Sequence, residues 1–216
     1  MIIKNFDLDK IDLKNFNLFL FYGDNQGFKD EIVEKICQQK NLKKTLYFEK
    51  EVLSNIENFL NSISTKSFFE NEKIIVIKNA TDKLKEVIND IYELQNPDIT
   101  VILISDLLEK KSKLRNFFEK TNNVICIPFY PDEHKDLNMI ANNFFKKKDI
   151  KISQQTINLI IDRANQSRQH LNNELQKIEN FALNKKEIKD VDIIKLTNLG
   201  KNYEISELVE TCLAKN

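Results

Sequence analysis

The chain has 216 residues, enough for one large or two modest domains, and its 33 basic and 33 acidic side chains leave no net charge. Long-range attraction therefore does not draw it onto nucleic acid or an anionic membrane, and any such contact must come from a local patch. No apolar run approaches the roughly 20 residues of a membrane helix, and the start MIIKNFDLDK lacks the order of a signal peptide, so we expect a cytoplasmic protein without membrane contacts.

In the first 130 residues, short apolar runs alternate with segments of helical periodicity. The predicted strands are Leu18–Tyr22, Thr45–Phe48, Lys73–Ile77, Ile99–Ile104 and Val124–Ile127. The intervening segments with apolar residues at helical spacing are Ile32–Ile36, Val52–Leu60, Leu84–Ile91 and Leu114–Phe118. This alternation is typical of a parallel sheet with crossover helices, so residues 1–130 are predicted to form a three-layer α/β domain.

After Pro131 only helical patterns occur. The predicted helices are Leu137–Phe145, Ser153–Ala164, Arg168–Leu183, Val191–Thr197 and Ile205–Leu213. Ser153 precedes its helix as an N-cap, since its hydroxyl can accept a bond from a free backbone N–H of the first turn. A small all-helical domain is expected to follow the α/β domain over residues 131–204.

The stretch FYGDNQGFKDE follows the first predicted strand, where phosphate-binding loops occur. Counted from Gly23, the pattern G-x-x-x-x-G-K-[ST] requires glycine, lysine and a hydroxyl residue at positions where the chain has Phe28, Lys29 and Asp30. Phe28 would crowd the phosphates, and Asp30 would place a carboxylate beside phosphate charge. The loop is interpreted as degenerate. In a purely structural interpretation, Gly23 makes the strand-to-helix turn, Asp24 or Asn25 caps the helix and Phe28 packs under it.

The second half of an ATPase site is missing as well. Such a site needs a strand that ends in paired acidic residues, to hold magnesium and orient water. The candidate strand Lys73–Ile77 is followed by Lys78 and Asn79, and Asp106 after the next strand stands alone. We expect no catalysis and no nucleotide cofactor; the alternative is an active P-loop NTPase with a divergent loop.

The cysteines and histidines do not have metal-ligand spacing. Cys37, Cys126 and Cys212 are far apart and form no C-x-x-C pair, and neither His134 nor His170 has ligand-type neighbours. No metal site is therefore expected, and the three cysteines are interpreted as buried apolar residues.

The succession of these segments resembles a known family. YGDNQGFKDEIVEKI, FFENEKIIVIKNA, TVILISDLLEKKSKLRNFFEK and LNNELQKIENFAL follow one another as in the delta subunit of the bacterial DNA polymerase III clamp loader. The resemblance covers essentially the whole chain. It implies an AAA+-type α/β domain with a degenerate nucleotide site, followed by a helical lid.

The resemblance also implies a function. The chain would bind the beta sliding clamp and open its ring for loading on primed DNA, as a non-catalytic subunit of the DNA-directed DNA polymerase III holoenzyme. A helical collar, which would start at residues 205–216, would join the tau or gamma and delta-prime subunits. Since the chain ends there, we expect a partial chain. The delta-prime subunit is a less suitable match, because its Ser-Arg-Cys segment has no counterpart around Cys126.

In this family, an apolar pair after the helix before the third strand contacts the clamp. At that position lie Phe68 and Phe69, with Ser64, Thr65 and Ser67 as flanking polar contacts. The alternative is that both rings belong to the core of the α/β domain.

Basic residues outside this segment are given no function. Arg168 lies where AAA+ ATPases have a lid arginine that senses the terminal phosphate, and it is interpreted here as a surface residue or a relic of such a site. The clusters LLEKKSKLR and Lys146–Lys148 are interpreted as solvated faces, with contact to DNA phosphates as the alternative.

Overall fold

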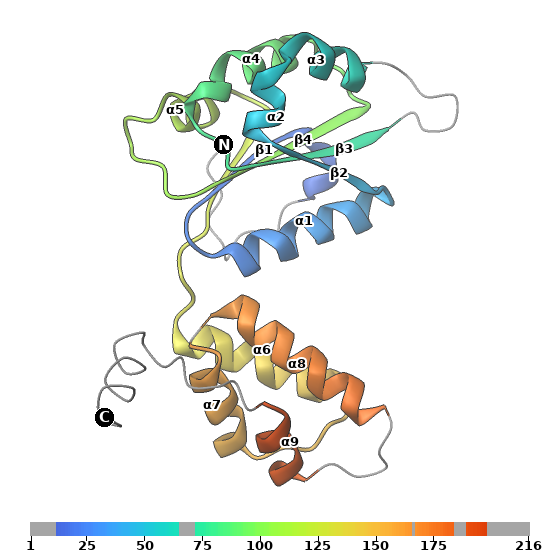
Figure 1. The fold of residues 1–216 in the computed structure, drawn as a ribbon, viewed down its shortest axis with the longest axis vertical. Helices are drawn as coiled ribbons and strands as arrows, with labels where there is room; N and C mark the ends of the chain where they lie inside the picture. The colour runs from blue at the N-terminus through green and yellow to red at the C-terminus, as the bar shows by residue number, and fades with distance from the viewer. Residues whose placement is uncertain (1–11, 65–71, 166, 184–188, 198–216) are drawn as a thin grey trace, which may run out of the picture. The chain divides into compact units, whose positions relative to one another are not determined.

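The computed structural model describes residues 12–64, 72–165, 167–183 and 189–197 (Figure 1). The chain divides into two compact units, residues 1–130 and 131–216. No helix in the described part of the chain is both long and apolar enough to cross a membrane.

The first unit is built on a parallel sheet of five strands in the order β2-β3-β4-β1-β5. The strands are β1 (Leu18–Tyr22), β2 (Lys44–Phe48), β3 (Lys73–Lys78), β4 (Ile99–Ser105) and β5 (Ile125–Pro128). In the centre, Leu20 of β1 is paired with Leu103 of β4 and Cys126 of β5. Strands β1, β4 and β5 are buried along their whole length, which explains why they appear in the sequence as continuous apolar runs.

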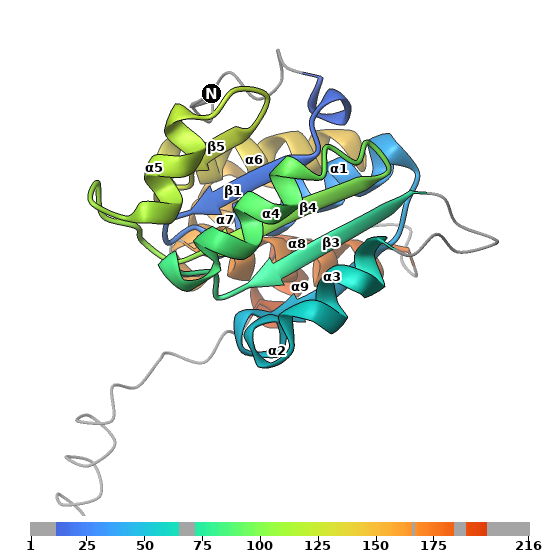
Figure 2. The ribbon, with the colours of Figure 1, turned by 90° about the horizontal axis from the view of Figure 1, so that it is seen from above.

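Helices cover both faces of this sheet (Figure 2). On one face lies α1 (Gln26–Lys40); on the other lie α2 (Glu49–Ser54), α3 (Ile56–Ser64), α4 (Lys85–Glu93) and α5 (Lys113–Lys120). Side chains alternate along β1, so that Phe19 and Phe21 join the core under α1 while Leu18 and Leu20 join the core under the other helices. The predicted three-layer α/β fold is confirmed.

One predicted helical segment is interrupted. The apolar pattern over Val52–Leu60 belongs to two helices, because Asn55 leaves the helical conformation, with φ −154°, and its Oδ1 accepts a hydrogen bond from the N–H of Asn58. An asparagine that caps the following helix ends the preceding one.

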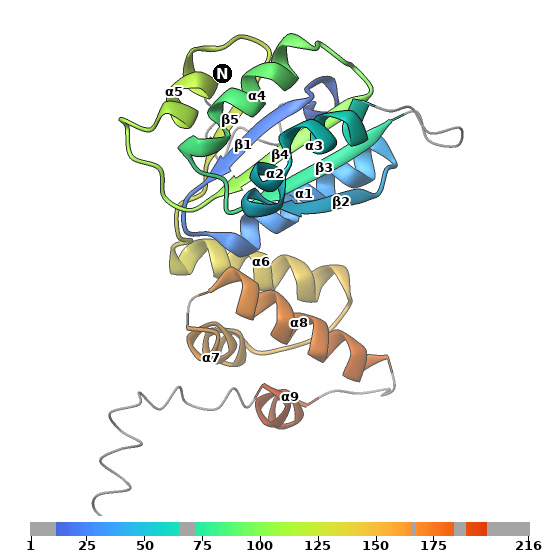
Figure 3. The same cartoon turned by 45° about the horizontal axis from the view of Figure 1, so that its top comes forward.

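The second unit consists of helices (Figure 3). Its described helices are α6 (His134–Lys147), α7 (Gln154–Arg163), α8 (Arg168–Ala182) and α9 (Asp190–Leu196). Their apolar faces meet in one core that includes Leu137, Ile160, Leu171 and Leu175. The hydroxyl of Ser153 caps α7, as predicted. The predicted helix Ile205–Leu213 lies outside the described residues.

Several turns use a left-handed backbone conformation without glycine. Among the described residues, six that are not glycine have a positive φ, namely Asn41, Asn79, Gln95, Asn123, Asp149 and Asn165. Asparagine and aspartate are enriched in this conformation because their short polar side chains bond locally.

Candidate functional site

The loop between β1 and α1 lies where open α/β sheets bind ligands. Because β1 lies between β4 and β5, its carboxyl end opens at the point where the strand order reverses. Gly23 turns the chain there with φ +120°, and a Cβ atom on it would lie 2.3 Å from the carbonyl oxygen of Phe129. No side chain fits at this position.

Backbone N–H groups of this loop are bonded within the protein. The N–H of Gly23 donates to the backbone carbonyl oxygen of Asp106 at 3.2 Å. The N–H of Asn25 donates to the backbone carbonyl oxygen of Phe129 at 3.2 Å. The N–H of Phe28 donates to Oδ1 of Asn25 at 3.1 Å, which makes Asn25 the N-cap of α1. In a phosphate loop, such N–H groups point at the bound anion. In this loop the N–H groups of Gly23, Asn25 and Phe28 point at acceptors of the protein instead.

The side chain of Lys29 fills the space beside the loop. Its Nζ donates to the carbonyl oxygens of Gly23 at 2.8 Å and Ser105 at 3.0 Å, and the residue is 1% exposed. Burial lowers the pKa of the Lys29 ammonium, and the charges of Asp106 and Asp30 partly counteract this shift. The lysine thus joins the carboxyl ends of β1 and β4.

Phe28 and Asp30 are held by neighbours of the first helical turn and the sheet. The half-buried ring of Phe28 meets the ring of Phe129 edge-on, with centroids 5.2 Å apart. Oδ1 of Asp30 accepts a hydrogen bond from Nε2 of Gln26 at 2.9 Å.

Arg168 is not a surface residue, so that part of its interpretation is wrong. Arg168 opens α8 and is buried; its Nε donates to Oδ2 of Asp132 at 2.8 Å and an Nη to Oδ1 at 2.5 Å. The sequence did not reveal this pair because its members are 36 residues apart. A planar guanidinium binds a carboxylate in this two-pronged way.

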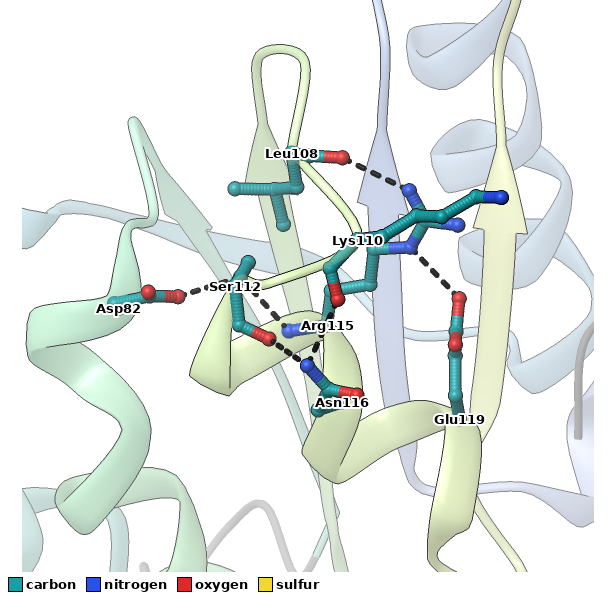
Figure 4. A network of polar contacts seen from close by, with 7 residues as sticks. All are labelled: Asp82, Leu108, Lys110, Ser112, Arg115, Asn116 and Glu119. Atoms are coloured by element: carbon teal, nitrogen blue, oxygen red, sulfur yellow. Dashed lines mark hydrogen bonds and ion pairs between the residues drawn. The ribbon is translucent and has the colours of Figure 1, made fainter.

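A polar network fixes the loop after β4 (Figure 4). Oδ1 of Asp82 accepts bonds from the hydroxyl of Ser112 at 2.5 Å and from the N–H of Leu114 at 3.0 Å. Burial of the Asp82 carboxyl acts to raise its pKa, but these hydrogen bonds hold the pKa below its usual value. This network was not predicted from the sequence, although Ser112 directly before a helical pattern is an N-cap signal.

On the other side of the same loop, Arg115 and Asn116 bind backbone carbonyls (Figure 4). An Nη of Arg115 donates to the oxygen of Leu108 at 2.9 Å, while its Nε donates to Glu119 at 2.7 Å. Nδ2 of Asn116 donates to the oxygen of Lys110 at 2.9 Å. The loop is held through its backbone, and the Lys110 side chain is exposed.

The predicted clamp-binding residues lie mostly outside the described part of the chain. Thr65, Ser67, Phe68 and Phe69 are not described, and Ser64 is the last residue of α3. What the structure gives is the two flanks of this segment, α3 and the start of β3.

The cysteine predictions are confirmed where they are described. Cys37 and Cys126 are buried, and burial raises the pKa of the Cys126 thiol to about 12; Cys212 lies outside the described residues. Within the described ranges, no group of three His, Cys, Asp or Glu side chains is placed to hold a metal ion.

Comparison with known proteins gave matches among solved structures. No protein-family model and no curated protein matched the sequence. The DNA clamp loader delta protein (YqeN) of Bacillus subtilis superposes with a TM-score of 0.58 at 16% identity, over 88% of this chain and 60% of that chain. The RuvB Holliday junction branch migration motor of Thermotoga maritima gives 0.56 at 12% identity, over 87% and 64%. The fold is of the AAA+ type.

At these identities the likeness shows the AAA+-type fold alone. It confirms the expected α/β domain with a parallel sheet, followed by a small helical domain. The chain spans about 60% of the length of the delta protein that it matches.

Proposed function

We propose that this chain is a clamp-loader subunit of the delta type, which binds the beta sliding clamp and opens its ring for loading on primed DNA in the cytoplasm. It works without its own ATPase and with the tau or gamma and delta-prime subunits as partners. The observation that carries the proposal is the filled phosphate loop: an AAA+-type fold in which Lys29 is bonded to the carbonyls of Gly23 and Ser105. The similarity to a clamp loader delta protein supports the choice of subunit.

The bonds of the loop argue against nucleotide binding. To reach a phosphate, Lys29 would have to leave both carbonyl oxygens unpaired at the buried end of the sheet. Within the second unit, the guanidinium of Arg168 is engaged as well, because it is paired with the buried carboxylate of Asp132. Breaking a buried ion pair costs about 3–5 kcal/mol when one charge is left uncompensated.

The segment proposed to bind the clamp is flanked by α3 and β3 at the amino-terminal end of the parallel strands, opposite to the end that carries the phosphate loop. The chain leaves α3 at Ser64 and enters β3 at Lys73, at the amino-terminal end of that strand. The phosphate loop, in contrast, follows the carboxyl-terminal end of β1, which runs parallel to β3. The two flanks of the proposed clamp-binding segment therefore lie at the opposite end of the strands from the filled loop.

The test is the double substitution Phe68→Ala/Phe69→Ala. Central aromatic residues of interfaces often cost about 2 kcal/mol or more on truncation, so affinity for the purified beta clamp in surface plasmon resonance should fall at least about tenfold. Phe48→Ala, which removes a ring that is 42% exposed on β2, is the matched control and should bind the clamp normally.

Two results would overturn the clamp-binding role. Normal clamp binding by the double variant excludes these rings as the anchor. A large drop of its melting temperature would instead return them to the core, since truncating a core Phe costs about 3–5 kcal/mol.

A calorimetric titration with ATP and magnesium tests the alternative of an active NTPase. We expect no heat of binding. A micromolar dissociation constant would show that Lys29 can be displaced, and would favour an NTPase with a divergent loop.

A further inference from the structure

Strand β2 forms one edge of the sheet of the first unit. Within the described part of the chain, it is paired with β3 alone. The direction of the peptide groups in β3 follows from the start of that strand, where the N–H of Lys73 donates to the carbonyl oxygen of Asp98, just before β4, at 2.8 Å. Because peptide groups alternate in direction along a strand, those of Ile74 and Val76 point at β2.

The peptide groups of Lys44 and Leu46 in β2 face outward as a result. In a parallel pair, a residue that points at the neighbouring strand bonds with the two residues that flank its register partner. The register partners of Ile74 and Val76 are Lys44 and Leu46, so β3 bonds with the residues on either side of these two. Lys44 and Leu46 therefore each direct one N–H and one C=O away from the sheet.

The side chains along this edge are basic at its start, apolar in its middle and acidic after its end. Lys43 precedes the strand, and at the other end Oε2 of Glu51 accepts a hydrogen bond from the outward N–H of Phe48 at 2.7 Å. Leu46 is the register partner of Val76, which belongs to the core under α1, so Leu46 and Phe48 lie on the α1 face. Their side chains are 46% and 42% exposed.

A second copy of β2 has the chemistry that this edge requires. A row that is basic at one end and acidic at the other is complementary to itself when two copies run antiparallel. We propose that two copies of this chain associate through antiparallel β2 strands, with Lys44 of each copy opposite Leu46 of the other. Each of these residues supplies one donor and one acceptor, so the pairing makes four backbone hydrogen bonds about a two-fold axis at Thr45. The N–H of Phe48 keeps its bond to Glu51.

The side chains fit this register. On the α1 face, the exposed ring of Phe48 would lie opposite the half-buried Leu42 of the second copy. On the other face, the exposed Thr45 would lie opposite Thr45 of the second copy, and such threonine pairs stabilise antiparallel strands. Two five-residue strands bury less than the roughly 1,000 Å² of a stable interface, so the dimer is weak and forms at high concentration. The proposal does not rest on clamp binding.

Cross-linking tests the register. In it, Thr45 and its copy form a non-hydrogen-bonded pair with Cα atoms about 4.5 Å apart, which a disulfide can span. Thr45→Cys in a Cys212→Ser background should form disulfide dimers with oxidised glutathione, while Cys37 and Cys126 are buried and stay in place. Lys50→Cys, at an exposed position of α2, is the control and should form few. Equal rates of cross-linking by the two variants would overturn the proposal.

Substitutions of Leu46 test the pairing by charge. Leu46→Lys places an ammonium group opposite Lys44 of the second copy, twice in each dimer. In sedimentation equilibrium of the full chain at about 10–500 μM, it should raise the dissociation constant of the dimer at least about tenfold. Leu46→Glu is the matched control, because it places a carboxylate opposite the same lysine, and its dissociation constant should stay within about threefold of the wild-type value.

Both Leu46 variants should melt like the wild type, because this side chain is nearly half exposed. A wild-type chain that remains monomeric up to about 500 μM would overturn the proposal, as would equal weakening of the dimer by Leu46→Lys and Leu46→Glu. Cross-linking of Thr45→Cys does not depend on Leu46 variants, so it decides the question even if one of them fails to fold.

Discussion

At the scale of single residues, Lys29 combines a charge with nearly complete burial. Lysine is rarely buried without partners, and here the oxygens of Gly23 and Ser105 receive its hydrogen bonds. The lysine thereby satisfies carbonyl groups at the ends of two neighbouring strands. In this chain a residue type that elsewhere binds phosphate contributes to the stability of the fold.

Lys29→Met keeps an unbranched side chain, one heavy atom shorter than lysine, and removes the donor. The oxygens of Gly23 and Ser105 then lose a bond, which should lower the free energy of unfolding in urea by about 1–3 kcal/mol. Lys43→Met, at an exposed position after α1, is the control and should change it little. Equal stability of the two variants would mean that Lys29 does not stabilise the fold.

Tyr22 should make stability depend on alkaline pH. Burial raises the pKa of Tyr22 from 10.0 to about 12, an effect to which Cys126 adds and which the nearby Arg115 guanidinium opposes. The folded state thus holds this proton more tightly than the unfolded state. The contribution of Tyr22 to the free energy of unfolding is fully present below pH 10 and is lost as the pH rises through about 12.

Tyr22→Phe should therefore lose less unfolding free energy than the wild type between pH 10 and about 12 in urea titrations. Tyr130→Phe removes a hydroxyl whose charge adds to the raised pKa of Tyr22, and should reduce the wild-type loss of unfolding free energy less than Tyr22→Phe does. A Tyr22→Phe slope identical to that of the wild type would contradict the assignment.

At the scale of elements, the strands were predictable because each is a compact apolar run between turn residues. The predicted strand Leu18–Tyr22 coincides with β1, and β2 begins only one residue before the predicted Thr45. The break at Asn55 was missed because the apolar residues on both sides of it keep one helical period. The capping bond from the N–H of Asn58 to Asn55 does not disturb that period. In the candidate site, the residue types of the loop predicted its chemistry. The contacts of Lys29 with Ser105 and of Arg168 with Asp132 were not predictable, because these partners come from distant parts of the chain.

Asn25 caps α1 and also bonds the carbonyl of Tyr130 after β5, so its substitution should lower stability more than the loss of a helix cap alone. Asn25→Ala removes the N-cap of α1 and the bond to Tyr130, so we expect a loss of about 1–3 kcal/mol in urea unfolding. Asn55→Ala removes the exposed cap of α3 and should cost only about 0.5–1 kcal/mol.

Asn25→Asp separates the two roles of this side chain. The carboxylate can still accept from the N–H of Phe28 but cannot donate to the oxygen of Tyr130. Its stability should lie between those of the wild type and Asn25→Ala. Equal losses from Asn25→Ala and Asn55→Ala would show that the bond to Tyr130 adds nothing.

At the scale of the whole molecule, each unit has a core of its own. The sheet unit buries two layers of apolar side chains, and the helical unit buries one that includes Leu175 and Ile178. Separate cores allow the units to open separately.

Leu175→Ala should destabilise the helical unit by about 2–5 kcal/mol. In hydrogen exchange, amides of α6 to α9 should exchange faster while those of β1 to β5 keep their rates. Gln176→Ala, at an exposed position of the same helix, is the control. Faster exchange throughout the sheet would mean that the two units unfold as one.

The left-handed turns also bear on how a genome can encode this fold. Asparagine, aspartate and glutamine fill six positions of positive φ in the described chain, and four of these are asparagine. Asparagine is encoded by AAT and AAC, whereas every glycine codon begins with GG. A genome biased toward A and T can therefore specify these turns with little glycine. Gly23 is different, because the carbonyl of Phe129 leaves no room for a Cβ atom. At position 23, replacement of the glycine codon by an A- or T-rich codon is therefore opposed by a steric clash, and not only by a conformational preference.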